Sequence, residues 1–78
     1  MLSAEVIRLQ TKELDFDFDA ARVKRIRILL GESQEEFARR LGTGKNTISG
    51  WERGEHIPQS GRIIRALLLA EQAAGQGQ

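Results

Sequence analysis

Apolar residues recur at helical spacing through most of the chain from residue 19 onward, and this pattern predicts a fold built from helices. A first helix is expected over residues 20–30, because Asp19 is suited to cap its start and Gly31 follows its end. Ser33 and Glu36 have the spacing of a capping box, in which each side chain accepts a hydrogen bond from the other's backbone N–H. A second helix is therefore predicted to begin directly after Ser33.

The second half of the chain continues the helical pattern. After a short Gly-Thr-Gly turn, a third helix is predicted over about residues 45–53, with Ile48 and Trp51 facing inward. A fourth helix, about residues 60–72, carries enough apolar side chains to complete the core. The remaining residues, 73–78, are small and polar and are expected to be a disordered tail.

Residues 1–18 are harder to interpret because they combine two patterns. Their first half has the apolar spacing of a helix, whereas the later residues Leu14, Phe16 and Phe18 alternate with acids as in a strand. Phe16 and Phe18 are expected to pack on the domain, on a second copy or on another protein. The predicted fold is all-α: a compact bundle of four to five helices over residues 19–72, preceded by an N-terminal arm.

Composition limits the chemistry that this small domain can perform. The 78 residues include no cysteine and one histidine, His56, which excludes thiolate zinc sites, disulfides and a cysteine nucleophile. No carboxylate pair, nucleophile with a base, or set of metal ligands is suitably spaced, so we expect neither an enzyme nor a cofactor. Apolar runs are far shorter than the roughly 20 residues of a membrane span, and residues 1–18 lack a signal-peptide core, so a cytoplasmic location is expected.

Charge is distributed unevenly along the chain. Residues 1–19 contain two cations and five carboxylates, for a net charge of −3, whereas residues 20–78 contain ten cations and six carboxylates, for a net charge of +4. This asymmetry favours a polyanionic partner for the body and a different role for the acidic arm. Small domains also show such imbalance by chance.

The segment from Gln34 to Arg53 has the spacings of a helix-turn-helix. Ala38 is small enough for a close helix crossing, Gly42 tolerates the positive φ of the turn, and Ile48 is the apolar plug that joins the two helices. A plain helical hairpin with the same apolar periodicity is the alternative.

The third predicted helix presents a polar stripe that suits the major groove of double-stranded DNA. Lys45, Asn46, Ser49, Gly50 and Arg53 fall on one side of it, and no acid interrupts them. Lysine can donate to guanine, asparagine can pair with adenine, and serine can donate or accept. We therefore predict Lys45, Asn46 and Ser49 as base-reading residues. The alternative is an ordinary solvated helix face.

Residues around this helix are suited to the DNA backbone. The N-terminus of the second helix and the amide of Gln34 can meet a phosphate, and Thr43, Thr47 and Arg53 flank the groove. Arg39 and Arg40 either add positive field or are merely solvated. His56 is expected to be an ordinary loop residue rather than a phosphate contact.

The stretch ARVKRIRILLGESQEEFARRLGTGKNTISGWERGE resembles the XRE family of helix-turn-helix domains, which have the lambdoid-repressor fold. The resemblance implies that Gln34 touches the DNA backbone and braces the recognition helix, and that Lys45, Asn46 and Ser49 occupy base-reading positions. It also implies an ion pair between Arg27 and Glu52. Gly50 departs from the pattern, because related domains often carry a longer reading side chain at this position.

The leading hypothesis is a sequence-specific transcriptional repressor. One such unit touches only a few base pairs, so we expect it to bind a palindromic operator as a homodimer. The pattern from Trp51 to Leu68 is further similar to the region after the recognition helix in HigA-type antitoxins. An autoregulating antitoxin is therefore favoured, with the acidic arm contacting a protein toxin. A phage-type regulator, including the autorepressors that accompany anti-CRISPR genes, and a protein-interaction module that uses the same fold are the alternatives.

Overall fold

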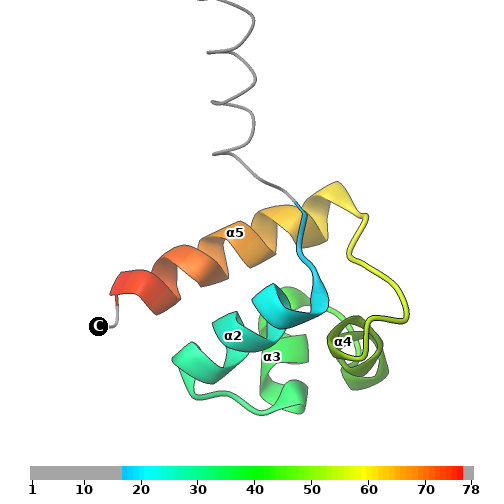
Figure 1. Ribbon diagram of the computed structural model, residues 1–78. Helices are drawn as coiled ribbons and strands as arrows, with labels where there is room; N and C mark the ends of the chain where they lie inside the picture. Colours follow the sequence, from blue (N-terminus) through cyan, green and yellow to red (C-terminus); the bar gives the residue numbers. More distant parts are fainter. Residues whose placement is uncertain (1–16, 77–78) are drawn as a thin grey trace, which may run out of the picture.

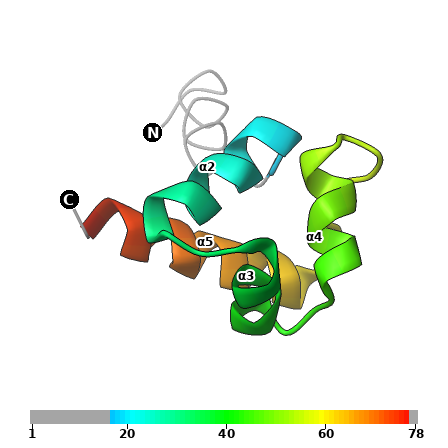
Figure 2. The same ribbon diagram turned by 90° about the horizontal axis from the view of Figure 1, so that it is seen from below.

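The computed structural model describes residues 17–76, which form four helices and no strand. The predicted all-α fold is confirmed over these residues. The helices follow one another as α2 (Ala20–Leu30), α3 (Gln34–Leu41), α4 (Lys45–Glu52) and α5 (Gly61–Gln76). The long helix α5 runs along one side of the domain, and α2, α3 and α4 gather on its other side (Figures 1 and 2). No helix in the described part of the chain is long and apolar enough to cross a membrane.

The ends of α2 are fixed by the residues that the sequence marks for this purpose. The Asp19 carboxylate accepts a hydrogen bond from the backbone N–H of Arg22 at 2.8 Å, which satisfies a donor that the first turn leaves unpaired. At the other end Gly31 adopts a left-handed conformation with φ 70°, which a residue with a side chain rarely adopts. The chain can therefore turn directly into α3.

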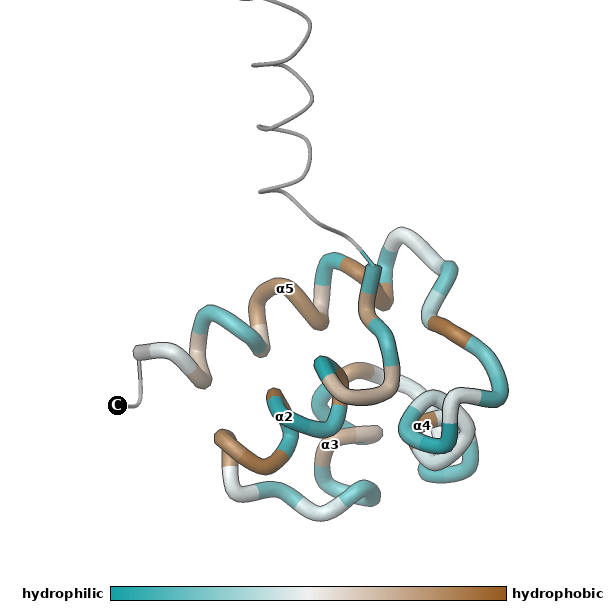
Figure 3. The backbone as a smooth tube through the Cα atoms, in the orientation of Figure 1, coloured by the Kyte–Doolittle hydropathy of each residue, from teal (hydrophilic) through white to brown (hydrophobic). Residues whose placement is uncertain are grey.

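One apolar core joins all four helices. Each helix contributes buried side chains, and the hydrophobic segments of α2 and α5 alternate with polar ones along each helix (Figure 3). The largest fully buried side chains are Phe18, Phe37, Ile26, Leu41, Ile48, Leu67 and Val23. Because burying one such side chain contributes about 1.5–3 kcal/mol, this shared core fixes the relative positions of the helices.

Phe18 belongs to this core, so the predicted boundary after residue 18 is wrong. Its side chain is only 2% exposed, and the Arg22 guanidinium lies 4.0 Å from the centre of its ring. Arg22 also contacts both carboxylate oxygens of Glu71 at 2.8 Å, which joins α2 to α5. Of the three expected locations for Phe18, the domain itself is the one observed. Phe16 and the rest of the arm lie outside the described residues.

The predicted disordered tail is also wrong for residues 73–76, because α5 continues to Gln76. Its buried residues Ile63, Leu67, Ala70 and Ala74 are spaced four, three and four apart, so they follow one face of the helix. Ala74 is 3% exposed despite its small size. Ala74, which was predicted to lie in a disordered tail, therefore extends the packed face of α5 by another turn. Residues 77–78 lie outside the described part of the chain.

Candidate nucleic-acid interface

The turn between α3 and α4 is built from local hydrogen bonds. Helix α3 starts with the predicted capping box: the Glu36 N–H donates to Ser33 Oγ at 3.1 Å, and the Ser33 N–H donates to Glu36 Oε1 at 2.9 Å. It ends at Gly42, whose φ of 74° reverses the chain, and the Thr43 N–H donates to the Ala38 carbonyl at 2.9 Å. These bonds fix where α4 begins relative to α3.

Apolar contacts then hold the two helices in a fixed wedge. Phe37, Ala38 and Leu41 of α3 are buried, as are Ile48 and Trp51 of α4. Ala38 is 3% exposed and Ile48 is fully buried, as the close crossing and the plug residue require. Trp51 is 4% exposed, so its indole is part of the core. The segment is therefore a helix-turn-helix with α4 as its second helix.

A polar cluster attaches the far end of α4 to α2. Arg27 forms a bidentate ion pair with Glu52, with Nε–Oε2 and Nη2–Oε1 distances of 2.7 and 3.0 Å, as the family resemblance implied. Arg27 also donates to the Glu32 carbonyl at 2.9 Å, and Gln34 Nε2 donates to Glu52 Oε1 at 3.2 Å. Gln34 thus occupies the bracing position expected of it.

The electrostatic balance at Glu52 favours the charged form. Its side chain is 6% exposed and that of Arg27 is 16% exposed. Burial alone would raise the pKa of Glu52, but hydrogen bonds from Arg27 and Gln34 outweigh it and hold this pKa below its ordinary value. The pKa of Arg27 is raised by the same pair. The cluster therefore remains ionised and holds the C-terminal end of α4 against α2.

The residues predicted to read bases lie on the outward side of α4. Lys45 and Asn46 are exposed, whereas Ser49 and the neighbouring Thr47 are half-buried. Thr43 is half-buried in the turn that leads into α4. The structure thus brings these side chains together around one exposed helix.

The exposed side chain of Arg53 is paired with Glu55, an acid that the sequence pattern did not place beside it. Its guanidinium forms a bidentate ion pair with Glu55, with distances of 2.8 and 3.0 Å, and donates another hydrogen bond to Ser49 Oγ. The hydrogen bonds from Arg53 lower the pKa of Glu55, which therefore stays charged. The polar stripe that the sequence predicted to be free of acids therefore has a carboxylate beside its C-terminal end, and a phosphate must compete with Glu55 for Arg53.

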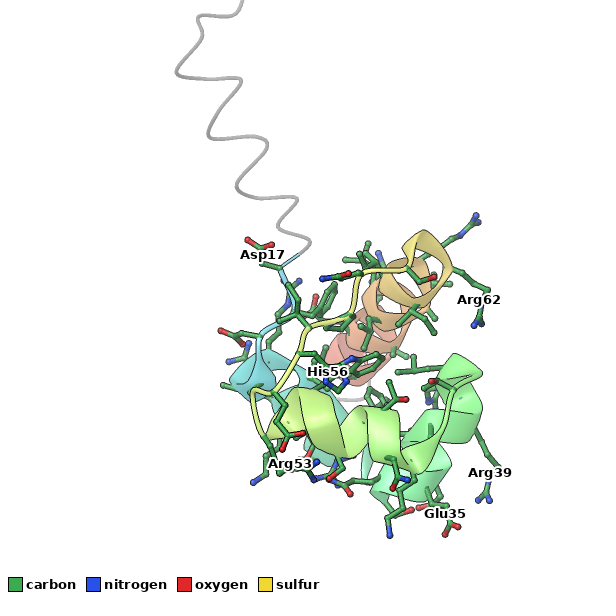
Figure 4. All side chains as sticks on the ribbon, turned by 90° about the vertical axis from the view of Figure 1, so that its right-hand side faces the viewer. Asp17, Glu35, Arg39, Arg53, His56 and Arg62 are labelled. Carbon is green, nitrogen blue, oxygen red and sulfur yellow. The ribbon has the colours of Figure 1, made fainter. Side chains whose placement is uncertain are left out.

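Gly50 shares one side of α4 with Asn46 but is covered instead of open to solvent, which corrects a second expectation. It is buried, and a Cβ atom added to it would lie 2.2 Å from His56 Cε1. The His56 side chain lies beside α4 in Figure 4. A glycine inside a helix destabilises it, so its presence in a polar face can indicate close approach by another group. That signal was available in the sequence, but the identity of the approaching group was not.

The other cations differ in their surroundings. Arg39 and its neighbour Glu35 point away from the body of the domain (Figure 4). Arg40 instead pairs with Glu32 at 2.6 Å, so it stabilises the connection between α2 and α3. Arg62 extends from α5 toward the carbonyls at the end of α3. Residues 17–76 contain no group of three or more histidine or acidic side chains that could hold a metal ion.

Two short helices are joined here by a tight turn, and the second helix packs on the domain with one side and exposes polar residues on the other. This arrangement is typical of helix-turn-helix DNA-binding domains. A family model described as Helix-turn-helix matches residues 23–68, which is more than half of the chain. The protein belongs to this XRE-type family of DNA-binding transcription regulators. We found no significant match to a curated protein or to a solved structure.

Proposed function

We propose that this protein is a sequence-specific repressor that reads its operator by inserting α4 into the major groove. The exposed side of α4 carries this proposal, because Lys45, Asn46 and Ser49 offer donors and acceptors that match base edges. The hydrogen-bonded cluster of Arg27, Gln34 and Glu52 on the inner side of α4 keeps these side chains in one orientation. Gln34, Thr43, Thr47 and Arg53 are the proposed contacts to the DNA backbone.

A homodimer on an imperfect palindrome is the second part of the proposal. One unit of this size covers only a few base pairs, so two half-sites about 34 Å apart supply the affinity that one cannot. Several large apolar side chains are available for a surface between two copies, since Ile28, Leu29 and Leu69 are 57%, 49% and 58% exposed. Analytical ultracentrifugation with and without operator DNA tests this part directly.

Selection of binding sites from a random duplex library, followed by titration of the selected site, tests the reading role. The variant Asn46→Ala should lose about 1–3 kcal/mol of preference at one base pair of each half-site and little affinity for random DNA. The variant Gln59→Ala is the matched control, because Gln59 is an exposed amide outside the helix-turn-helix. Equal losses on selected and random DNA for Asn46→Ala would contradict the assignment.

Salt dependence separates this function from a protein-interaction module. Release of counterions from phosphates makes DNA affinity fall steeply as salt concentration rises. We expect this fall for the wild-type protein on both selected and random duplexes. An association with DNA that is insensitive to salt would favour the interaction module.

Within this class we propose an autoregulating antitoxin. The similarity of the region after α4 to that of HigA-type antitoxins supports this role, as does the net charge of −3 in residues 1–19, which suits a basic toxin. The test is co-expression of the full chain with the product of the adjacent gene. Rescue of growth together with repression of their shared promoter is expected, and repression without any complex would leave a phage-type regulator.

A further inference from the structure

The loop after α4 folds back onto the middle of that helix. Gly54 turns the chain with φ 76°, and the Glu55 N–H donates to the Gly50 carbonyl at 3.0 Å. This brings the His56 ring against Gly50. A Cβ atom at residue 50 would lie 2.2, 2.9 and 3.0 Å from three atoms of the imidazole. The ring therefore fills the space in which a side chain from residue 50 would begin.

The position of this ring relative to the reading side of α4 follows from helix geometry. Residue 50 lies four positions after Asn46, so the two share one side of the helix and are one turn apart. A side chain in an α-helix leans toward the helix N-terminus, which at residue 50 is the direction of Asn46. His56 as a whole remains exposed. Its imidazole is thus held at the edge of the proposed reading surface and open to solvent.

We propose that His56 is a specificity-determining residue of this interface, which replaces the reading side chain that Gly50 lacks. This inference rests on the proposed function of α4. A neutral imidazole carries one donor and one acceptor, so it can pair with the acceptors and donors that base pairs display in the major groove. Gly50 is then required because any larger residue would displace the ring. The reading surface combines residues from the helix with one from the following loop.

Two single variants test this proposal from opposite sides. His56→Ala removes the ring, and Gly50→Ala displaces it by a steric clash. Either change should reduce discrimination at one selected base pair by roughly 5- to 150-fold, the range for loss of a good base contact. Because alanine favours a helix over glycine, Gly50→Ala should keep or raise the melting temperature. The matched controls are Gln59→Ala in the same loop and Gly61→Ala, where an added Cβ meets nothing within 4 Å.

The double variant decides whether the two residues act as one unit. If Gly50→Ala acts only by displacing His56, it should cause no further loss of discrimination in the His56→Ala background. The probes are the duplex selected by the wild-type protein, its single-base variants and a random duplex. Unchanged base preference in either single variant, additive losses, or an equal loss on random DNA would each overturn the proposal.

The same experiment separates this proposal from the function on which it rests. Failure of the wild-type protein to select any consensus would refute the repressor function. A wild-type consensus that Asn46→Ala alters and His56→Ala leaves intact would refute only the role of His56. Melting curves of all variants exclude misfolding as the cause of any loss.

Discussion

Replacing Arg27 with methionine should strongly destabilise the domain, because it leaves a mostly buried carboxylate without its main partner. The Glu52 side chain is 6% exposed, and the substitution removes both guanidinium hydrogen bonds to it. The Glu32 carbonyl loses a donor at the same time. Breaking a buried pair by removing one partner typically costs about 3–5 kcal/mol. We expect about 3 kcal/mol, at the lower end of this range, because Gln34 still donates to Glu52.

This loss is large relative to the stability of such a small protein. At about 0.05–0.15 kcal/mol per residue, a chain of this length has roughly 4–12 kcal/mol of stability in total. For a domain of 60–100 residues each kcal/mol shifts the melting temperature by about 4–8 °C, so a fall of roughly 12–24 °C is expected. Thermal unfolding followed by circular dichroism measures it. Arg25→Met, the same change at an exposed position of α2, is the control.

The dependence on pH gives this prediction a second readout. The pKa of Glu52 is lowered in the folded protein, so its pair stabilises the fold above the unfolded-state pKa and is lost as the pH falls. In Arg27→Met, burial still raises the pKa of Glu52, but the guanidinium that lowers it is gone. Protonation of this carboxyl then removes the buried charge and recovers part of the lost stability. The difference in stability between the two proteins should therefore narrow from pH 7 to pH 4. A melting temperature of Arg27→Met equal to that of Arg25→Met would refute the reasoning, as would a gap that widens with acid.

Two further substitutions test contacts that the sequence pattern did not predict. Phe18→Ala should cost about 3–5 kcal/mol in chemical denaturation because the ring is fully packed in the core, and a loss below about 0.5 kcal/mol would place it outside the domain. Glu55→Gln should raise affinity for random duplex DNA by about 1.5- to fivefold, because the exposed ion pair competes only weakly with a phosphate and its loss frees Arg53. The salt dependence of that binding should also steepen, and unchanged or weaker binding would show that Arg53 meets no phosphate.

The helices and the motif could be predicted because their signals are local. Asp19, Ser33 and Glu36 cap helices through bonds that span three residues, and Gly31 and Gly42 end helices through their own backbone conformation. Such interactions are encoded in neighbouring residues. For the same reason the inward positions of α3 and α4 follow from periodicity alone.

The limits of the domain could not be predicted in this way. Phe18 and Ala74 lie just outside the predicted helices, yet both are buried in the folded protein. Arg22 and Glu71 are 49 positions apart, so their ion pair exists only after α2 and α5 have packed. A hydrophobic pattern shows that a residue prefers burial, but it does not show which surface covers it.

The helix-turn-helix itself was determined by the sequence, because its caps, its turn and its apolar wedge all depend on short-range spacing. The tertiary structure alone decided what the exposed side of α4 presents. Arg53 is held by Glu55, and Gly50 is covered by His56, through a loop that returns to the helix. Both contacts depend on the path of the backbone after Gly54. Periodicity assigns residues to sides of a helix, whereas the fold decides which other groups reach those sides.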